Sequence, residues 1–128
     1  MIRSGDITGF DDAEVLDTKE NREMANVNIL GTEYDLVVRA DLDSTVDGLC
    51  HTVKKIIELK PVDKMLEGDA TEDERTKRFK EVMRHEMIHA LFTESGLDSY
   101  SNDEVLVDWI ASQFPKIVEL FTANDCMG

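Results

Sequence analysis

The stretch from Thr71 to Ser95 constrains the fold of this chain more than any other part of its sequence. It contains neither proline nor glycine, and its first four residues, Thr-Glu-Asp-Glu, match the capping box that begins many helices. Gly96 follows at the position just beyond a helix end, where glycine is common. The sequence therefore predicts one long helix over residues 71–95, against which the rest of a small domain must pack.

Two histidines, His85 and His89, lie four residues apart in the middle of this predicted helix, in the pattern His-Glu-x-x-His. Residues at that spacing share one face of a helix, so both imidazoles can reach one tetrahedral metal ion. Glu86 cannot easily bind the same ion, but it can act as general base on a water at the metal's open position. Because the flanking residues from Val82 to Phe92 are mostly apolar, these polar groups would be costly to bury without partners. A metal ion would be such a partner; the alternative is a histidine pair satisfied by ordinary hydrogen bonds.

A catalytic zinc ion usually has three protein ligands, so a third residue should join the histidine pair. We expect Glu104 in this role, because it stands at the start of the next predicted helix, where the chain can fold back against the first. Asp108 lies on the same face four residues later. His51 is the remaining histidine and is predicted on a strand, as a partly exposed residue. Glu94 is out of phase with His85 and is predicted to face away.

The second helix is predicted from about Ser101 to Phe121, with a kink or break at Pro115. Glu104 and Asp108 also have interpretations within it that involve no metal. The four residues that end at Glu104 match a capping box, and Asp108 can equally be a solvated helix residue. The apolar residues of this helix are predicted to pack in the core. They are Trp109, Ile110, Phe114, Ile117 and Val118.

A small antiparallel sheet of about three strands is predicted over residues 25–59. Apolar and polar residues alternate over residues 27–29 and 34–38, and a third strand is expected over residues 49–59. The expected fold class is α+β, with this sheet packed on two main helices, the first of which carries the histidine pair. Residues 1–23 are polar and are predicted to be an extension, with a short helix over 11–22 as its one element. Residues 24–128 then form a single domain.

Charge and composition narrow the range of partners. The chain has 128 residues and a formal net charge of −14, so it repels nucleic-acid phosphates and anionic membrane surfaces. No apolar run approaches the length of a membrane span, and the first residues lack the apolar stretch of a secretion signal. Cys50 and Cys126 form no CxxC pair and are expected to be free thiols in a reducing compartment. We therefore expect a cytoplasmic protein that binds neither nucleic acid nor membranes.

The order His85-Glu86-x-x-His89 and then Glu104-x-x-x-Asp108 resembles the pattern of the gluzincins, a clan of zinc metallopeptidases. In that clan the glutamate of the second helix is the third zinc ligand, and the aspartate supports the first histidine. The resemblance therefore implies Zn²⁺ as the cofactor, held by His85, His89 and Glu104, with Asp108 behind His85. It also implies a hydrolase that acts on a protein or peptide substrate.

The segment Glu104–Ala111 also resembles the ImmA/IrrE-like metallopeptidases, where Glu-x-x-Ala-Asn-x-Phe-Ala is typical. The chain as a whole resembles small phage-encoded proteins of this kind, in which an Arg-His-Glu-x-x-His-Ala helix precedes Val-Asp-Trp-x-Ala-x-Gln-Phe-Pro-Lys, here residues 107–116. Such a protein would work in the host cytoplasm.

In the expected mechanism, zinc lowers the pKa of a water, and Glu86 takes its proton and passes it to the leaving amine. In gluzincins an edge strand often holds the substrate, and we expect Val53–Leu59 in that role. Tyr100 and His51 are the candidates for stabilising the oxyanion. Two other classes stay open: a phage regulatory or interaction protein that binds zinc without cleaving anything, and a structural domain in which the motif is incidental.

Overall fold

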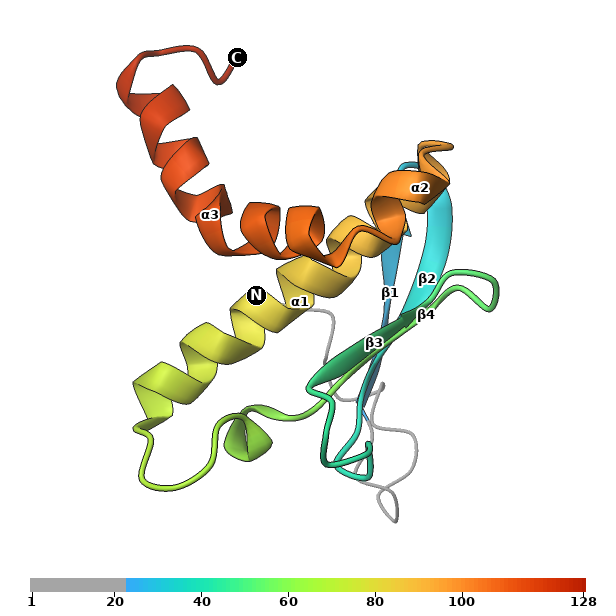
Figure 1. Ribbon diagram of the computed structural model, residues 1–128, viewed down its shortest axis with the longest axis vertical. Helices are drawn as coiled ribbons and strands as arrows, with labels where there is room; N and C mark the ends of the chain where they lie inside the picture. The colour runs from blue at the N-terminus through green and yellow to red at the C-terminus, as the bar shows by residue number, and fades with distance from the viewer. Residues whose placement is uncertain (1–22) are drawn as a thin grey trace.

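The computed structural model describes residues 23–128, which form an α+β domain with a four-stranded sheet and three helices (Figure 1). The predicted fold class is therefore confirmed, whereas the predicted number of strands is wrong. The extension and short helix predicted within residues 1–23 lie outside the described residues, except that Glu23 already begins a strand. The elements in chain order are β1 (Glu23–Ile29), β2 (Thr32–Val38), β3 (Gly48–His51), β4 (Ile56–Leu59), a single 3₁₀ turn η3 (Val62–Lys64), α1 (Glu72–Glu94), α2 (Asp98–Ser101) and α3 (Glu104–Ala123).

The sheet is mixed, not antiparallel throughout, and its strand order is β1-β2-β4-β3. β1 and β2 form a hairpin whose two-residue turn has both Leu30 and Gly31 at positive φ, as a type I′ turn requires. β4 then pairs with β2 in parallel and with β3 in antiparallel fashion. The long connection after β2 makes this order possible, because it carries the chain past the position of β4 to the far edge of the sheet.

The single third strand predicted over residues 49–59 is in fact two strands, β3 and β4, joined by a turn in which Lys55 has a φ of 62°. This corrects the prediction for the substrate strand as well. Most of Val53–Leu59 is β4, and its backbone is already paired on both sides by β2 and β3. Among the described strands, β3 and not β4 is therefore the edge on this side of the sheet.

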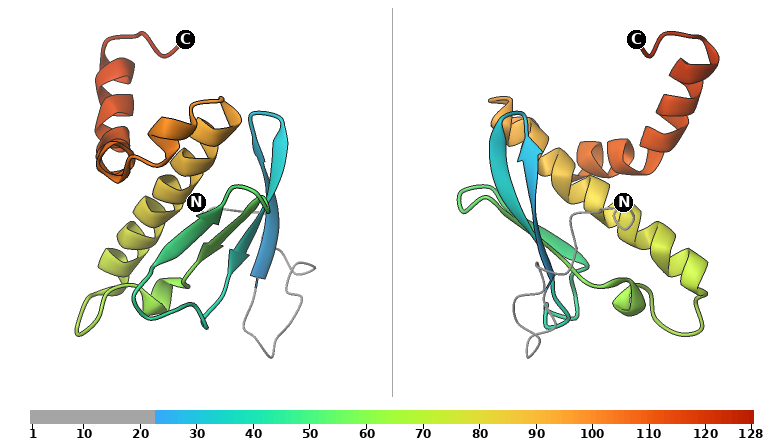
Figure 2. Two further views of the ribbon diagram at one scale, coloured as in Figure 1. Left: turned by 45° about the vertical axis from the view of Figure 1, so that its right-hand side comes forward. Right: turned by 180° about the vertical axis from the view of Figure 1, so that it is seen from behind.

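α1 lies across one face of the sheet and forms the main core with it (Figure 2). Gly48, at the start of β3, is needed for this approach, because a Cβ there would lie 2.8 Å from Cγ1 of Val82 on α1. The missing side chain lets the edge strand run close beside the helix. The buried side chains of this core include Tyr34, Leu36, Ile57 and Leu59 from the sheet, Met65 after η3, and Phe79, Val82 and Met83 from α1.

The ends of α1 confirm the prediction made from its capping pattern. Thr71 Oγ1 accepts a hydrogen bond from the backbone N–H of Glu74, and the Glu74 carboxylate accepts one from the N–H of Thr71. After the helix, Gly96 adopts a φ of 75°, the left-handed conformation that commonly ends a helix. Local chemistry therefore sets both ends of the helix that carries the histidines.

The second predicted helix differs from the structure in its first turns. Ser101 ends the short α2 and is buried, and Asp103 is the N-cap of α3, where its side chain accepts a hydrogen bond from the N–H of Leu106. The alternative interpretation of Ser101–Glu104 as a capping box is therefore wrong. Glu104 is the first residue of α3, and its side chain is directed elsewhere.

α3 crosses α1 with its first half and then bends at Pro115, as predicted (Figure 1). Val107 and Ala111 pack against Ile88 of α1 in a second, smaller core. The half after Pro115 projects away from the rest of the domain in every view (Figures 1 and 2). The prediction that the apolar residues of this helix are core is wrong for Trp109 and Phe114, which are 56% and 46% exposed. Ile110 does pack against the smaller core, and Ile117 and Val118 are half-buried.

None of the helices within residues 23–128 combines the length and apolar character needed to cross a bilayer.

Candidate metal centre

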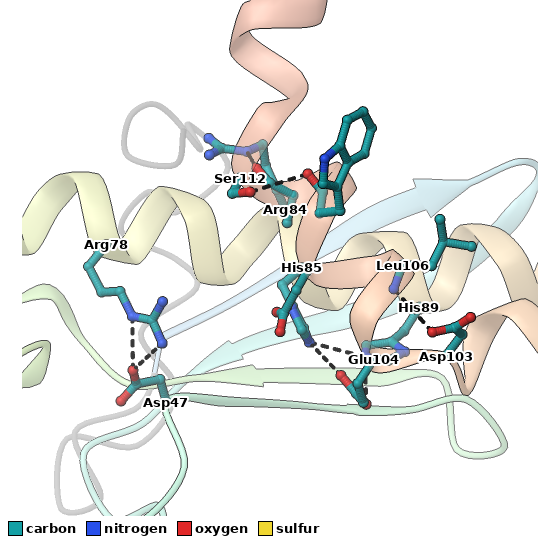
Figure 3. Close-up of polar contacts among 12 residues, drawn as sticks. Asp47, Arg78, Arg84, His85, His89, Asp103, Glu104, Leu106 and Ser112 are labelled. Carbon is teal, nitrogen blue, oxygen red and sulfur yellow. Dashed lines mark hydrogen bonds and ion pairs between the residues drawn. The ribbon is translucent and has the colours of Figure 1, made fainter.

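The crossing of α1 and α3 brings three potential metal ligands to one point (Figure 3). His85 and His89 come from adjacent turns of α1, and Glu104 comes from the first position of α3. Glu104 Oε1 lies 3.2 Å from His85 Nε2, and Oε2 lies 3.3 Å from His89 Nε2. The two Nε2 atoms are themselves 3.2 Å apart. The predicted group of His85, His89 and Glu104 is therefore assembled closely enough to hold a metal ion.

The other ring nitrogen of each histidine has its own partner. His85 Nδ1 lies 2.8 Å from Oδ1 of Asp108, one turn after Glu104 on α3. His89 Nδ1 is hydrogen bonded to the backbone carbonyl oxygen of Ser101. Carbonyl and carboxylate oxygens accept hydrogen bonds, so both Nδ1 atoms must donate. In a neutral imidazole the second nitrogen then carries a lone pair, and both lone pairs are on the Nε2 atoms that face Glu104.

Four acceptor atoms therefore converge with no donor between them: two imidazole nitrogens and the two carboxylate oxygens of Glu104. Such a cluster is unfavourable unless a cation or additional protons lie among the acceptors. Two imidazole nitrogens and one carboxylate form one of the donor sets found in catalytic zinc sites with an open position. The residues thus fit a metal ion by their chemistry as well as by their distances.

Glu86 lies beside this centre on α1 and is buried, with 7% of its surface exposed. Within residues 23–128 its carboxyl group makes no side-chain hydrogen bond. Burial, together with the negative charges of Glu104 and Asp108, raises its pKa to about 8. A carboxyl group with a raised pKa holds a proton more readily than an exposed glutamate, which is the property that a general base needs.

The centre opens into a cleft of about 830 Å³. Glu86, both histidines and Glu104 line one side, and β3 with the turn after it lines the other, including Gly48 and Cys50. Burial raises the pKa of the Cys50 thiol to about 12, so this cysteine is neutral in the cleft wall. The volume is in the range of sites that bind small molecules or short segments of chain.

The structure does not bring the two predicted oxyanion residues to the centre. The Tyr100 ring packs against Phe92 with 5.9 Å between ring centroids, and the His51 ring is hydrogen bonded to Glu58 at 2.8 Å. Neither Tyr100 nor His51 lines the cleft.

Glu94 faces away from the histidines, as predicted, and accepts hydrogen bonds from Lys55, Tyr34 and Thr32 of the sheet. These partners, the Lys55 ammonium first, lower the pKa of Glu94 to about 2.

Two residues that support the centre were missed from the sequence. The Ser101 hydroxyl donates to the backbone carbonyl oxygen of His89, while the carbonyl of Ser101 orients the His89 ring. Arg84 Nε donates to the carbonyl oxygen of Ala111 at 2.7 Å and so ties α3 to α1. No pattern of spacing signals either role, because both depend on where α2 and α3 lie against α1.

No family model, curated protein or solved structure matches this chain, so the argument for its function rests on the geometry of the centre.

Proposed function

We propose that this chain is a zinc-dependent metallopeptidase of the gluzincin type that hydrolyses a protein or peptide substrate. The observation that carries the proposal is the convergence of His85, His89 and Glu104 with the buried Glu86 at the wall of an open cleft. A structural metal site would have no need of a fourth, unpaired carboxyl group next to it. A Zn²⁺ ion held there would polarise a substrate carbonyl and make a water more acidic.

The residues around the ligands have positioning roles in this proposal. Asp108 holds the His85 ring through Nδ1, and the Ser101 carbonyl does the same for His89. Both contacts keep the Nε2 lone pairs directed at the metal position, as partners behind histidine ligands usually do. Arg84 holds α3 against α1 and so keeps Glu104 within reach of the two rings.

Glu86 is the group that we propose moves the proton. Its carboxylate would take a proton from the attacking water and deliver it to the amine that leaves. Burial raises the pKa of Glu86 most, and the negative charges of Glu104 and Asp108 raise it further. A bound cation would offset these charges and would so favour the ionised form of Glu86 that accepts the proton.

We propose that the substrate lies in the cleft as an extended segment beside β3. β3 is an edge strand and its residues line the cleft opposite the histidines, so it offers unpaired backbone groups along the path to the centre. This replaces Val53–Leu59, which the sequence suggested.

The test compares zinc content and turnover of a diverse peptide library in the same preparations of wild type and Glu86→Gln. Glutamine preserves the shape of the side chain but cannot accept the proton. We expect the variant to keep its zinc and to lose turnover by roughly 10²–10⁴-fold. Glu81→Gln, which removes another α1 carboxylate that does not line the main cleft, is the matched control and should retain activity.

Each other outcome favours a named alternative. Equal turnover by Glu86→Gln and wild type would remove Glu86 from the mechanism. Zinc binding without turnover by wild type would favour a non-catalytic zinc-binding regulatory protein. A folded protein that binds no zinc would leave a structural domain in which the motif is incidental.

A further inference from the structure

A second concave surface lies on α1, on a different face of the helix from the metal centre. It is a groove of about 430 Å³, and none of its lining residues lines the metal cleft. Its floor is a stripe of α1 with the spacing of one helix face, and Ile110 and Phe114 of α3 form a wall. The stripe consists of Arg84, Met87, Ile88, Leu91, Phe92 and Ser95.

Among the described residues, the second half of α3 is an apolar helix that packs on neither α1 nor the sheet (Figures 1 and 2). We call residues 115–123 the arm. After the bend at Pro115 the arm leads away from α1 and from the sheet (Figures 1 and 2). Leu120 is 59% exposed and Phe121 is 42% exposed. The apolar residues Phe114, Ile117, Val118 and Phe121 follow the i, i+3, i+4, i+7 spacing of helices that lie in an apolar groove.

We propose that the arm of one copy of this chain lies in the α1 groove of a second copy, and that the second copy returns the same contact. The result is a two-fold dimer in which one kind of contact occurs twice. The arm is roughly 13 Å long and the α1 stripe from Arg84 to Ser95 roughly 16 Å, at 1.5 Å per residue. Groove and arm therefore match in length as well as in apolar character.

The bend at Pro115 explains why the partner is a second copy and not the same chain. The first half of α3 is anchored across α1 by Val107 and Ala111, and Phe114 already forms part of the groove wall. The arm then leads away from α1, and none of its residues lines the groove of its own chain (Figure 1).

The charge distribution favours this location for a contact between identical chains. Two copies with a net charge of −14 each repel one another over most of their surfaces. The arm carries one lysine and one glutamate, Lys116 and Glu119, and the groove carries one charged residue, Arg84. The proposed contact therefore joins surfaces without the excess negative charge. Because the contact occurs twice, the dimer buries two arms and two grooves. This doubles the buried surface area and brings it closer to the ~1,200 Å² at which specific interfaces begin.

The test is the mass of the full chain in solution, by sedimentation velocity over a concentration series. We expect a dimer for wild type, and tighter association as salt screens the repulsion. Phe121→Glu in the arm and Leu91→Glu in the groove should each weaken dimerisation by at least roughly tenfold. Leu30→Glu is the control, because Leu30 is an exposed apolar residue in the β1–β2 turn, away from the arm and the groove, and it should leave the dimer intact. Circular dichroism and zinc content check that each variant remains folded.

A mixture of the two variants gives an independent readout. The Phe121→Glu chain keeps its groove and the Leu91→Glu chain keeps its arm, so mixing them should restore one of the two contacts and produce a weaker heterodimer. A wild type that is monomeric at high micromolar concentration would overturn the proposal. So would a dimer that persists in both variants, since the interface would then lie elsewhere. A monomer whose melting temperature falls with Leu91→Glu would show instead that another part of the same chain fills the groove.

Discussion

The two helices that meet at the metal centre contribute to it in different ways. On α1 the side chains of His85 and His89 are 19% and 12% exposed, and Glu86 is buried. On α3 the side chains of Glu104 and Asp108 are 64% and 71% exposed. The α1 groups are held by the packing of the core helix, whereas the α3 groups are held by the position of one helix end. We infer that α1 would define where a metal ion lies and that α3 would tune how tightly the ion is held.

The largest expected effect is the loss of the α1 ligands. His85→Ala or His89→Ala should abolish stoichiometric zinc binding, because two ligands from the remaining residues do not make a tight site. The zinc-dependent gain in melting temperature should disappear as well, since the metal ties α1 to α3 in the folded state only. Metal analysis and thermal melts with and without a chelator measure both effects.

The third histidine offers the matched control for this experiment. His51 contacts Glu58 and lies outside the cleft, so His51→Ala should bind zinc as wild type does. If His51→Ala lost zinc as completely as the α1 variants, the assignment of the ligands to α1 would be wrong.

Glu104→Gln tests the α3 side and should have a smaller effect. Glutamine is a neutral and weaker oxygen donor, so we expect zinc affinity to fall by at least roughly tenfold while the protein stays folded. Competition with a chromophoric chelator gives the affinity. Asp103→Asn is the control, because it removes a neighbouring negative charge and asparagine still caps the helix. Equal affinity of Glu104→Gln and wild type would mean that the third ligand lies elsewhere.

Asp108→Asn should weaken zinc binding less than Glu104→Gln, since Asp108 touches the His85 ring and not the metal position. The amide oxygen can still accept from Nδ1, but without the negative charge that strengthens the imidazole as a ligand. The same chelator competition ranks the two variants. The reverse order of effects would indicate that Asp108 binds the ion and that Glu104 supports it.

The smallest expected effect is on stability and concerns Glu94, a carboxylate whose partners all lie within the protein. Lys55, Tyr34 and Thr32 lower the pKa of Glu94 to about 2, below its ordinary value of 4.5. A lowered pKa in the folded state stabilises the fold above pH 4.5, and this contribution is lost as the pH falls toward 2. Glu94→Gln should therefore melt at a lower temperature than wild type at pH 7, and the difference should shrink below pH 4.

Thermal melts of the zinc-free proteins across that pH range separate this contribution from that of the metal. A difference between Glu94→Gln and wild type that stays constant from pH 7 to pH 2 would show that the ionisation of Glu94 does not contribute.

The parts of the centre that could be predicted are those that depend on neighbours in sequence. The start of α1 follows from the hydrogen bonds between Thr71 and Glu74, and the shared face of His85 and His89 follows from the helical repeat. For Glu104 the sequence leaves two interpretations open, because Ser101–Glu104 also matches a helix cap. Asp103 takes that capping role in the structure, which leaves the Glu104 carboxylate free to face the histidines.

The order of the strands in the sheet could not be predicted from the sequence pattern. Alternation identified strands in residues 25–59 but not their order, because register and neighbours depend on pairing between distant segments. The order β1-β2-β4-β3 makes β3 the edge strand, and Gly48 allows that edge to approach Val82. The side of the cleft opposite the metal ligands was therefore decided by tertiary packing.

The apolar face of the arm shows most clearly which features depend on local sequence and which depend on tertiary structure. The sequence by itself determined that residues 114–121 form an amphipathic helix bent at Pro115, because helical spacing and the ring of proline act locally. It did not determine which surface that helix covers, and the expectation of a core position was wrong for Phe114. Only the tertiary structure decided this, because the anchoring of Val107 and Ala111 on Ile88 fixes the direction in which the chain leaves α1. Hydrophobic spacing predicts that one face of a helix will be buried. The surface that covers this face depends on how the rest of the chain packs.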